Sequence, residues 1–209
     1  MRAITSSNNK KGWHFWGATF LLSLLSTNVA FCLDGEAILK ALRDSNADTR
    51  RRALESPELA VCYSSDADEK NCPPNPGLFG QLNDELIRLL KDPDPSIRRV
   101  AAQYLVVSTD ARAVKALAPL LRDVDENVRE VATRGYVHFT VSDPAIVREL
   151  ERLLKDNNKN VRKNAAMTLG SNGTRQSLDV MREAYSRETD PDVKKLFAET
   201  LKHLEKQRR

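Results

Sequence analysis

The sequence predicts an all-α protein in which about five helix pairs stack into one αα superhelix, a solenoid. The first observation is a pattern that recurs at a nearly constant interval. Its central apolar residue, here called the anchor, recurs at intervals of 31, 33 and 32 residues, at Ile97, Val128, Val161 and Val193. Thr49 takes the anchor position in a fifth copy, 48 residues before Ile97, which leaves room for an insertion between the two.

The second observation is helical spacing of apolar residues inside each copy. Residues 86–105, 117–136 and 150–169 superpose without a gap and read LIRLLKDPDPSIRRVAAQYL, LAPLLRDVDENVREVATRGY and LERLLKDNNKNVRKNAAMTL. Leucines three and four apart predict a first helix, and apolar residues four apart from the anchor onward predict a second. Because such short pairs cannot bury their apolar stripes alone, neighbouring copies must stack.

The third observation is a helix-capping residue three positions before every anchor. Asn and Asp side chains accept hydrogen bonds from the unpaired N–H groups of a first helical turn. The five residues are Asn46, Asp94, Asp125, Asn158 and Asp190. Pro95 and Pro191 follow two of them, at the one helical position where proline costs little. Each cap therefore predicts where a second helix begins.

These features resemble the HEAT-repeat family, particularly the short bacterial HEAT-like repeats also found in phycobilisome lyases. The resemblance covers about residues 35–205 and rests on the leucine pair, the aspartate after it, the Val-Arg dipeptide and the small residues that follow. We expect a single domain at 33–209. Its repeats lie at about 35–54, 81–108, 113–139, 144–170 and 175–205, and an insertion lies at 55–80.

The resemblance also implies a ladder of ion pairs between repeats. In that family the aspartate that ends the first helix and the arginine after the anchor form such a ladder. The matching central residues are Asp92, Arg98, Asp123, Arg129, Asp156 and Arg162. Asp44 and Arg50 match in the first copy, whereas Glu188 and Lys194 replace the pair in the last. Catalytic pairs or phosphate clamps are the alternative, but a residue repeated in every copy serves something common to every copy.

Residues 1–32 have the features of a cleavable signal peptide. A basic leader precedes an apolar run at 17–25, and Ala30 and Cys32 have the spacing of an A-x-A-like cleavage site. We therefore expect a mature chain that begins at Leu33 and is exported, to a bacterial periplasm or out of the cell. An uncleaved anchor and a buried N-terminal helix are the alternatives, although the run is short for a membrane span.

Removal of this leader takes away most of the net positive charge. The formal charge of +4 falls by three, to +1, because the leader holds three basic residues and no acidic ones. A nearly neutral mature chain lacks the basic character typical of nucleic-acid binding.

Export also bears on the three cysteines. Cys62 and Cys72 form an even pair in the mature chain, which predicts a disulfide, with two free thiols as the alternative. Cys32 is removed with the leader or is lipidated. The preceding residues partly match a bacterial lipoprotein box, but Phe31 is bulky where that box has a small residue. Membrane attachment is expected only if Cys32 is lipidated.

The insertion is one candidate for recognition, because insertions in repeat arrays commonly fall on a binding face. It combines apolar and acidic side chains, namely Tyr63, Leu78, Phe79, Asp66, Asp68 and Glu69. A recognition loop and a passive cover for the first repeat both fit this composition.

A second candidate lies on the second helices. Residues two and six after each anchor share one helix face, beside the buried stripe. They are Arg99, Gln103, Glu130, Arg134, Lys163, Met167, Lys195 and Glu199. The resemblance implies that second helices line the concave side, so these residues predict a shallow, mainly basic groove that binds a protein partner of unknown identity. An ordinary solvated helix face is the alternative.

The residue pattern holds no catalytic constellation, metal site or cofactor motif. Only His138 and His203 follow the leader, and no glycine-rich phosphate loop follows a strand pattern. The leading interpretation is an exported scaffold that is not an enzyme and needs no cofactor. The alternatives are a cofactor-handling or lyase-like protein related to the phycobilisome lyases, and a structural component of the envelope.

Overall fold

A computed structural model describes residues 35–63, 76–108, 110–137, 139, 141–172 and 174–206. The predicted leader at 1–32, Cys72 of the predicted disulfide, and His138 lie outside these ranges. So do three acidic residues of the insertion, Asp66, Asp68 and Glu69. In the ranges given, the regular structure is helical throughout, which confirms the predicted all-α solenoid. None of the described helices has the length and apolar character needed to cross a membrane.

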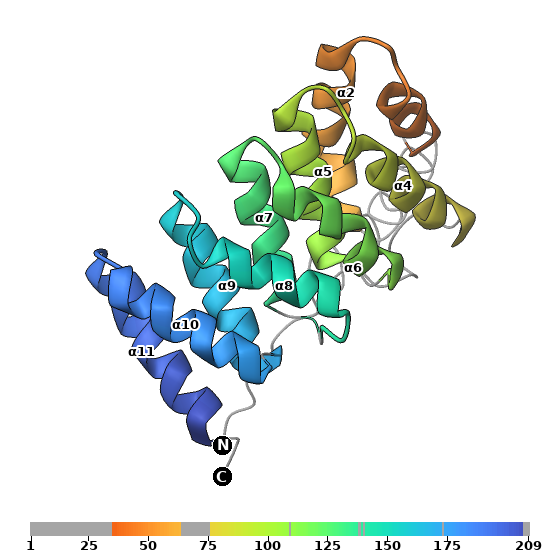
Figure 1. The fold of residues 1–209 in the computed structure, drawn as a ribbon. Helices are drawn as coiled ribbons and strands as arrows, with labels where there is room; N and C mark the ends of the chain where they lie inside the picture. Colours follow the sequence, from red (N-terminus) through yellow and green to blue (C-terminus); the bar gives the residue numbers. More distant parts are fainter. Residues whose placement is uncertain are drawn as a thin grey trace, which may run out of the picture.

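Five helix pairs follow one another along the chain (Figure 1). The first pair consists of a helical stretch at 35–42 and α2 (Ala47–Leu54), and α3 (Pro57–Cys62) comes after it. The second pair is α4 (Pro76–Leu89) with α5 (Pro95–Val107). In the third pair, α6 (Arg112–Leu117) and the 3₁₀ helix η1 (Ala118–Arg122) together form the first helix, and α7 (Glu126–Tyr136) is the second. The fourth pair is α8 (Pro144–Leu153) with α9 (Lys159–Asn172), and the fifth is α10 (Arg175–Arg187) with α11 (Pro191–Lys206).

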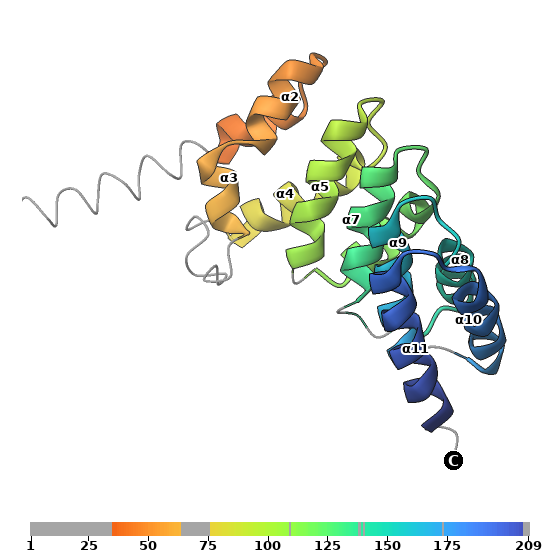
Figure 2. The same cartoon turned by 90° about the vertical axis from the view of Figure 1, so that its left-hand side faces the viewer.

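The second helices form one layer and the first helices another. Helix α5 packs on α7, α7 on α9, and α9 on α11, so these four helices lie side by side (Figure 2). In the other layer α8 packs on η1 and α10 packs on α8. The four apolar anchors are fully buried between the layers, within one continuous core.

The predicted caps begin the second helices as expected. Asn46 and Asp125 each accept hydrogen bonds from two backbone N–H groups of the following turn, and Asp94 accepts one from Ser96. Asn158 and Asp190 accept the equivalent bonds at distances of 2.8 to 3.4 Å. Local hydrogen bonding thus sets the start of α2, α5, α7, α9 and α11.

The first helix of the third pair is not a continuous α-helix. Helix α6 ends at Leu117 and the chain continues as η1, which contains Pro119. Proline has no N–H to donate and its ring crowds the preceding turn, so a short 3₁₀ segment replaces regular α-helix there.

The insertion supplies more of the core than its composition suggested. Helix α4 begins at Pro76, five residues before the predicted repeat, and Leu78 is buried within it. Tyr63 is buried as well, and its hydroxyl donates to Asn83 Oδ1 at 2.6 Å. Its ring lies 5.3 Å from that of Phe79 and 5.0 Å from that of Tyr104, between ring centres. These apolar residues therefore cover the second pair.

Candidate functional site

The predicted ladder residues lie in four ion pairs, each of which links one repeat to the next. In every pair the arginine follows the anchor and donates through Nε and Nη2 to both oxygens of a carboxylate in the following repeat. The pairs are Arg50 with Asp92 (2.8 and 3.1 Å), Arg98 with Asp123 (2.7 and 2.7 Å), Arg129 with Asp156 (2.7 and 3.0 Å), and Arg162 with Glu188 (2.7 and 3.0 Å).

Each arginine also binds the turn of its own repeat. Arg98 Nη1 donates to the carbonyl oxygens of Asp92 and Pro93 at 2.7 and 3.1 Å. Arg129 Nη1 makes the equivalent bonds to Asp123 and Val124 at 2.8 and 3.2 Å. One guanidinium thus joins two consecutive turns, which explains why the arginine recurs in the first four repeats, each of which has a following repeat to bind.

The pKa values of three ladder carboxylates, Asp123, Asp156 and Glu188, are lowered, which favours the ionised form. Burial disfavours the charge of Asp123, but hydrogen bonds from Arg98 and from the Asp125 N–H outweigh it and lower the pKa of Asp123. The same balance, with Arg129 and the Asn158 N–H as donors, lowers the pKa of Asp156. A carboxylate stabilised in this way is a poor general acid or base near neutral pH. The geometry therefore favours a structural role over a catalytic one.

The predicted groove residues lie on the layer of second helices, two on each of α5, α7, α9 and α11. Arg134, Met167, Lys195 and Glu199 are exposed, and Arg99, Gln103, Glu130 and Lys163 are partly buried. We call these eight residues the second-helix face. They come together because the helices that carry them pack in sequence.

The cations of the second-helix face are not paired with acids. Within the described ranges, none of Arg99, Arg134, Lys163 and Lys195 makes an ion pair. Glu130 accepts a hydrogen bond from Asn158 Nδ2 at 3.3 Å. Positive charge on this face therefore remains available to a partner.

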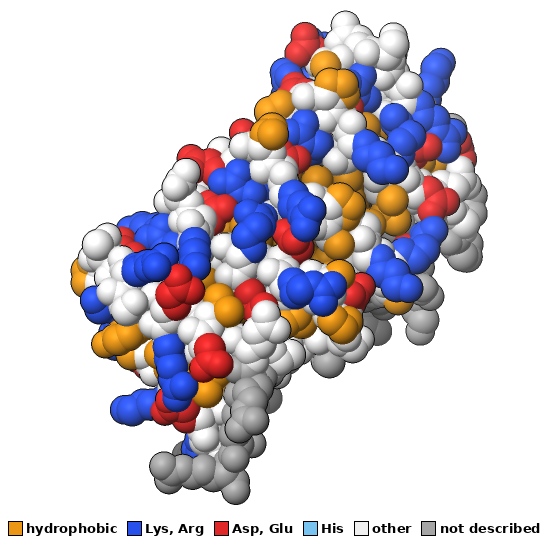
Figure 3. Space-filling view, in the orientation of Figure 1, with side chains coloured by type: hydrophobic (Ala, Val, Ile, Leu, Met, Phe, Trp, Pro, Cys, Tyr) orange, Lys and Arg blue, Asp and Glu red, His pale blue; other side chains and the backbone are white. Residues whose placement is uncertain are grey.

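The first helices carry a second set of charges that sequence reasoning missed. In three places a glutamate binds a cation from the preceding repeat and another cation three or four residues further along its own helix. We call these bridging clusters; they are Arg43–Glu85–Arg88, Arg122–Glu149–Arg152 and Lys155–Glu183–Arg187. Figure 3 shows Lys and Arg side chains with Asp and Glu side chains beside them across one face of the molecule.

Two arginines of these clusters also bind backbone. Arg88 Nη2 donates to the Leu42 carbonyl oxygen at 2.6 Å, and Arg152 Nη2 donates to that of Leu121 at 2.7 Å. Both carbonyls lie at the end of the first helix of the preceding repeat, where the last carbonyl groups have no N–H partner within the helix. The sequence signal was a glutamate three residues before an arginine, at Glu85 and Glu149.

The described part of the chain contains no cluster of side chains suited to bind a metal ion. It contains no group of three or more His, Cys, Asp or Glu side chains able to hold an ion. His203 is exposed near the end of α11. Cys62 is buried at the end of α3, and the predicted disulfide stays a prediction because Cys72 lies outside the described residues.

The family model that describes HEAT repeats matches residues 35–137 and 135–202. This chain belongs to the HEAT-repeat family. Its HEAT repeats account for most of the described residues and for both surfaces above. The result confirms the resemblance found in the leucine pairs and Val-Arg dipeptides, and solenoids of this kind typically act as scaffolds or binding proteins.

Solved structures with the same architecture include designed proteins. An engineered protein is 21% identical with a TM-score of 0.58; the match covers 82% of this chain and 47% of that one, about half its length. Computationally designed armadillo repeat proteins for modular peptide recognition are 17% identical, covering 79% and 80%, with a TM-score of 0.58. A designed armadillo repeat protein in complex with the peptide (KR)4 is 18% identical, covering 79% and 80%, with a TM-score of 0.54. At these identities the likeness shows the fold alone. No curated protein matches the sequence significantly.

Proposed function

We propose that this HEAT-repeat protein is a scaffold that binds a protein partner on its second-helix face. The observation that carries the proposal is a row of four cations that make no ion pair within the described residues, one on each of four helices packed side by side: Arg99, Arg134, Lys163 and Lys195. The cations of the bridging clusters, in contrast, are bound to glutamates.

The chemistry of the face favours an acidic or mixed segment of the partner. Four of its eight side chains are cationic and two are anionic, so complementary charge speeds association and selects the partner more than it adds affinity. Met167, 44% exposed, adds apolar contact area. A rigid array loses little entropy on binding. A designed armadillo repeat protein of similar fold is in complex with the basic peptide (KR)4. The excess of cations on the second-helix face favours an acidic segment instead.

Charge reversal on the second-helix face tests this proposal. A variant with Arg99→Glu, Arg134→Glu and Lys163→Glu should lose capture of the partner from the compartment where the protein resides. Its helical circular dichroism and melting temperature should stay close to those of the wild type, because none of the three cations makes an ion pair in the described residues.

The matched control changes the same amount of charge in the layer of first helices. Lys115 lies in α6, Arg148 lies in α8 and Lys91 lies in the turn after α4. All three are exposed and make no ion pair within the described ranges. Arg88 and Arg152 are unsuitable, because they bind the preceding repeat. The control with Lys91→Glu, Lys115→Glu and Arg148→Glu should still capture the partner. Equal capture by both variants would contradict the proposal.

We further propose that the mature protein is exported and begins near Leu33. The leader at residues 1–32 supports this, and an oxidising compartment would favour a Cys62–Cys72 disulfide. Intact mass of protein purified from its native host should show loss of the leader. Alkylation should modify Cys62 and Cys72 only after reduction. Retention of residues 1–32, or two reactive thiols before reduction, would contradict the assignment. A lipid adduct on Cys32 would establish the lipoprotein alternative.

A further inference from the structure

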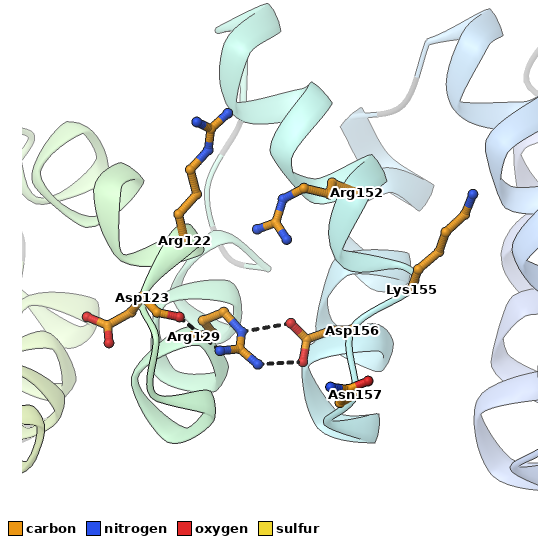
Figure 4. A pocket seen from close by; sticks show the side chains of 7 residues that line it. All are labelled: Arg122, Asp123, Arg129, Arg152, Lys155, Asp156 and Asn157. Carbon is orange, nitrogen blue, oxygen red and sulfur yellow. Dashed lines mark hydrogen bonds and ion pairs between the residues drawn. The ribbon is translucent and has the colours of Figure 1, made fainter.

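A pocket of about 550 Å³ opens between the third and fourth repeats, on the edge where the first helices end (Figure 4). It lies over the Arg129–Asp156 pair of the ladder. Its lining residues are Arg122, Asp123, Arg129, Arg152, Lys155, Asp156 and Asn157. It is separate from the second-helix face, with which it shares no residue.

The acids and the cations of this pocket differ in exposure. The side chains of Asp123 and Asp156 are only 7% and 4% exposed, and both are bound by ladder arginines. The side chains of Arg122, Arg152 and Lys155 are 71%, 50% and 47% exposed. A solute that enters the pocket therefore meets cations first.

The bridging clusters that contain these cations carry a net positive charge. Glu149 is shared by Arg122 and Arg152, and Glu183 is shared by Lys155 and Arg187. Each cluster holds two positive charges and one negative charge. Hydrogen bonds from Arg122 and then from Arg152 lower the pKa of Glu149 to about 2, so the carboxylate stays ionised and the excess is one charge.

The two arginines also keep unused donors. Within the described residues, Arg122 donates through Nη2 to Glu149, and Arg152 donates through Nε to Glu149 and through Nη2 to the Leu121 carbonyl. A guanidinium carries five N–H donors in one plane, an arrangement that matches the oxygens of phosphate and sulfate.

We propose that this pocket binds a tetrahedral oxyanion, a phosphate or sulfate ester group of a ligand. Arg122 and Arg152 are the residues that hold it, and Glu149 weakens the binding by competing for both guanidinium groups. The Lys155 side chain points away from the two arginines, toward Glu183 of α10, and adds positive charge to the same edge (Figure 4). The hollow continues toward α10, because two adjoining pockets of about 350 and 410 Å³ share Lys155 and Asp156 with it. A ligand larger than one ester group therefore has room to extend along this edge.

Titration of the whole protein with inorganic phosphate, at low ionic strength and pH 7.5, tests the site by calorimetry. Arg122→Ala should weaken binding about tenfold, since it removes one charged hydrogen-bond donor. Glu149→Gln should strengthen binding, because it frees both guanidinium groups from a competing charge. Arg148→Ala, on the same helix but outside the pocket lining, should leave binding unchanged.

The opposite signs of the two effects separate a binding role from a structural one. Loss of inter-repeat contacts would make both Arg122→Ala and Glu149→Gln less stable, but it would not make one of them bind the anion more tightly. Absence of saturable binding, or equal affinities in the wild type and both variants, would overturn the proposal. A parallel titration with inorganic sulfate distinguishes the sources: tighter phosphate binding points to a phosphate ester, and tighter sulfate binding to a sulfate ester.

Discussion

At the scale of single residues, Arg129 shows how one side chain serves two repeats. It binds both oxygens of Asp156 in the next repeat and two carbonyl oxygens in its own turn. Asp156 is 4% exposed at its side chain, so water cannot fully replace the lost donors. Removal of Arg129 leaves a nearly buried carboxylate with little besides the Asn158 N–H to stabilise it.

Arg129→Ala should therefore lower the free energy of unfolding by about 3 kcal/mol, the lower end of the range for a broken buried pair. For a chain of this size the melting temperature should fall by roughly 6 to 12 °C. Thermal unfolding followed by circular dichroism measures this shift. Arg134→Ala, an exposed position on the same helix, should change stability by less than about 0.5 kcal/mol. If the Arg129→Ala variant melted at the same temperature as the wild type, the structural role of the ladder would be ruled out.

Sequence reasoning anticipated the ladder residues but missed the bridging clusters, and the difference has a physical cause. The ladder aspartate and arginine occur in four of the five copies, so alignment of the copies reveals them. The clusters recur irregularly, and their inter-repeat partners lie 27 residues or more apart, as in Arg122 with Glu149 and Arg43 with Glu85. Such pairs depend on how consecutive first helices pack, which the sequence pattern does not specify.

At the scale of helices, the starts of the second helices were predictable and those of the first helices were less so. A cap such as Asp125 acts through hydrogen bonds within one turn, so local sequence decides it. Helix α4 begins at Pro76, earlier than the repeat pattern indicates, because Leu78 and its neighbours are buried against the rest of the protein. Tertiary packing decides that boundary.

Alanine substitutions at two glycines distinguish the effect of helix propensity on stability from the effect of helix packing. A Cβ added at Gly135 in α7 would lie 2.8 Å from Val106 Cγ2 in α5 and 3.3 Å from Leu117 Cδ1, so the helices would have to move apart. Gly135→Ala should destabilise the protein, since overpacking costs about 1 to 3 kcal/mol and the gain in helix propensity is about 1 kcal/mol.

Gly80→Ala in α4 is the matched control, because no atom lies within 4 Å of the added Cβ. It should stabilise the protein by up to about 1 kcal/mol. Urea unfolding of the two variants measures both changes. An increase in stability for Gly135→Ala as large as that for Gly80→Ala would show that α5 and α7 do not approach so closely.

At the scale of the whole molecule, repetition made the solenoid predictable. Each repeat packs against its neighbours, so the same apolar anchors, caps and ladder residues recur along the chain. The residues of the second-helix face differ from repeat to repeat; equivalent positions hold Arg99, Glu130 and Lys163. The sequence pattern places them on one face but does not indicate which charges are paired. The structure shows which of these charges are paired, and the proposed function depends on that distinction.

Site-specific photo-cross-linking most directly tests whether partners bind the second-helix face. Met167 is an exposed, uncharged residue of that face, and Val124, 93% exposed, lies in the turn between η1 and α7. Replacement of either residue by benzoylphenylalanine preserves every charge of the protein. We expect the partner to be cross-linked from position 167 and not from position 124. Cross-links from position 124 with none from position 167 would contradict the proposed binding surface.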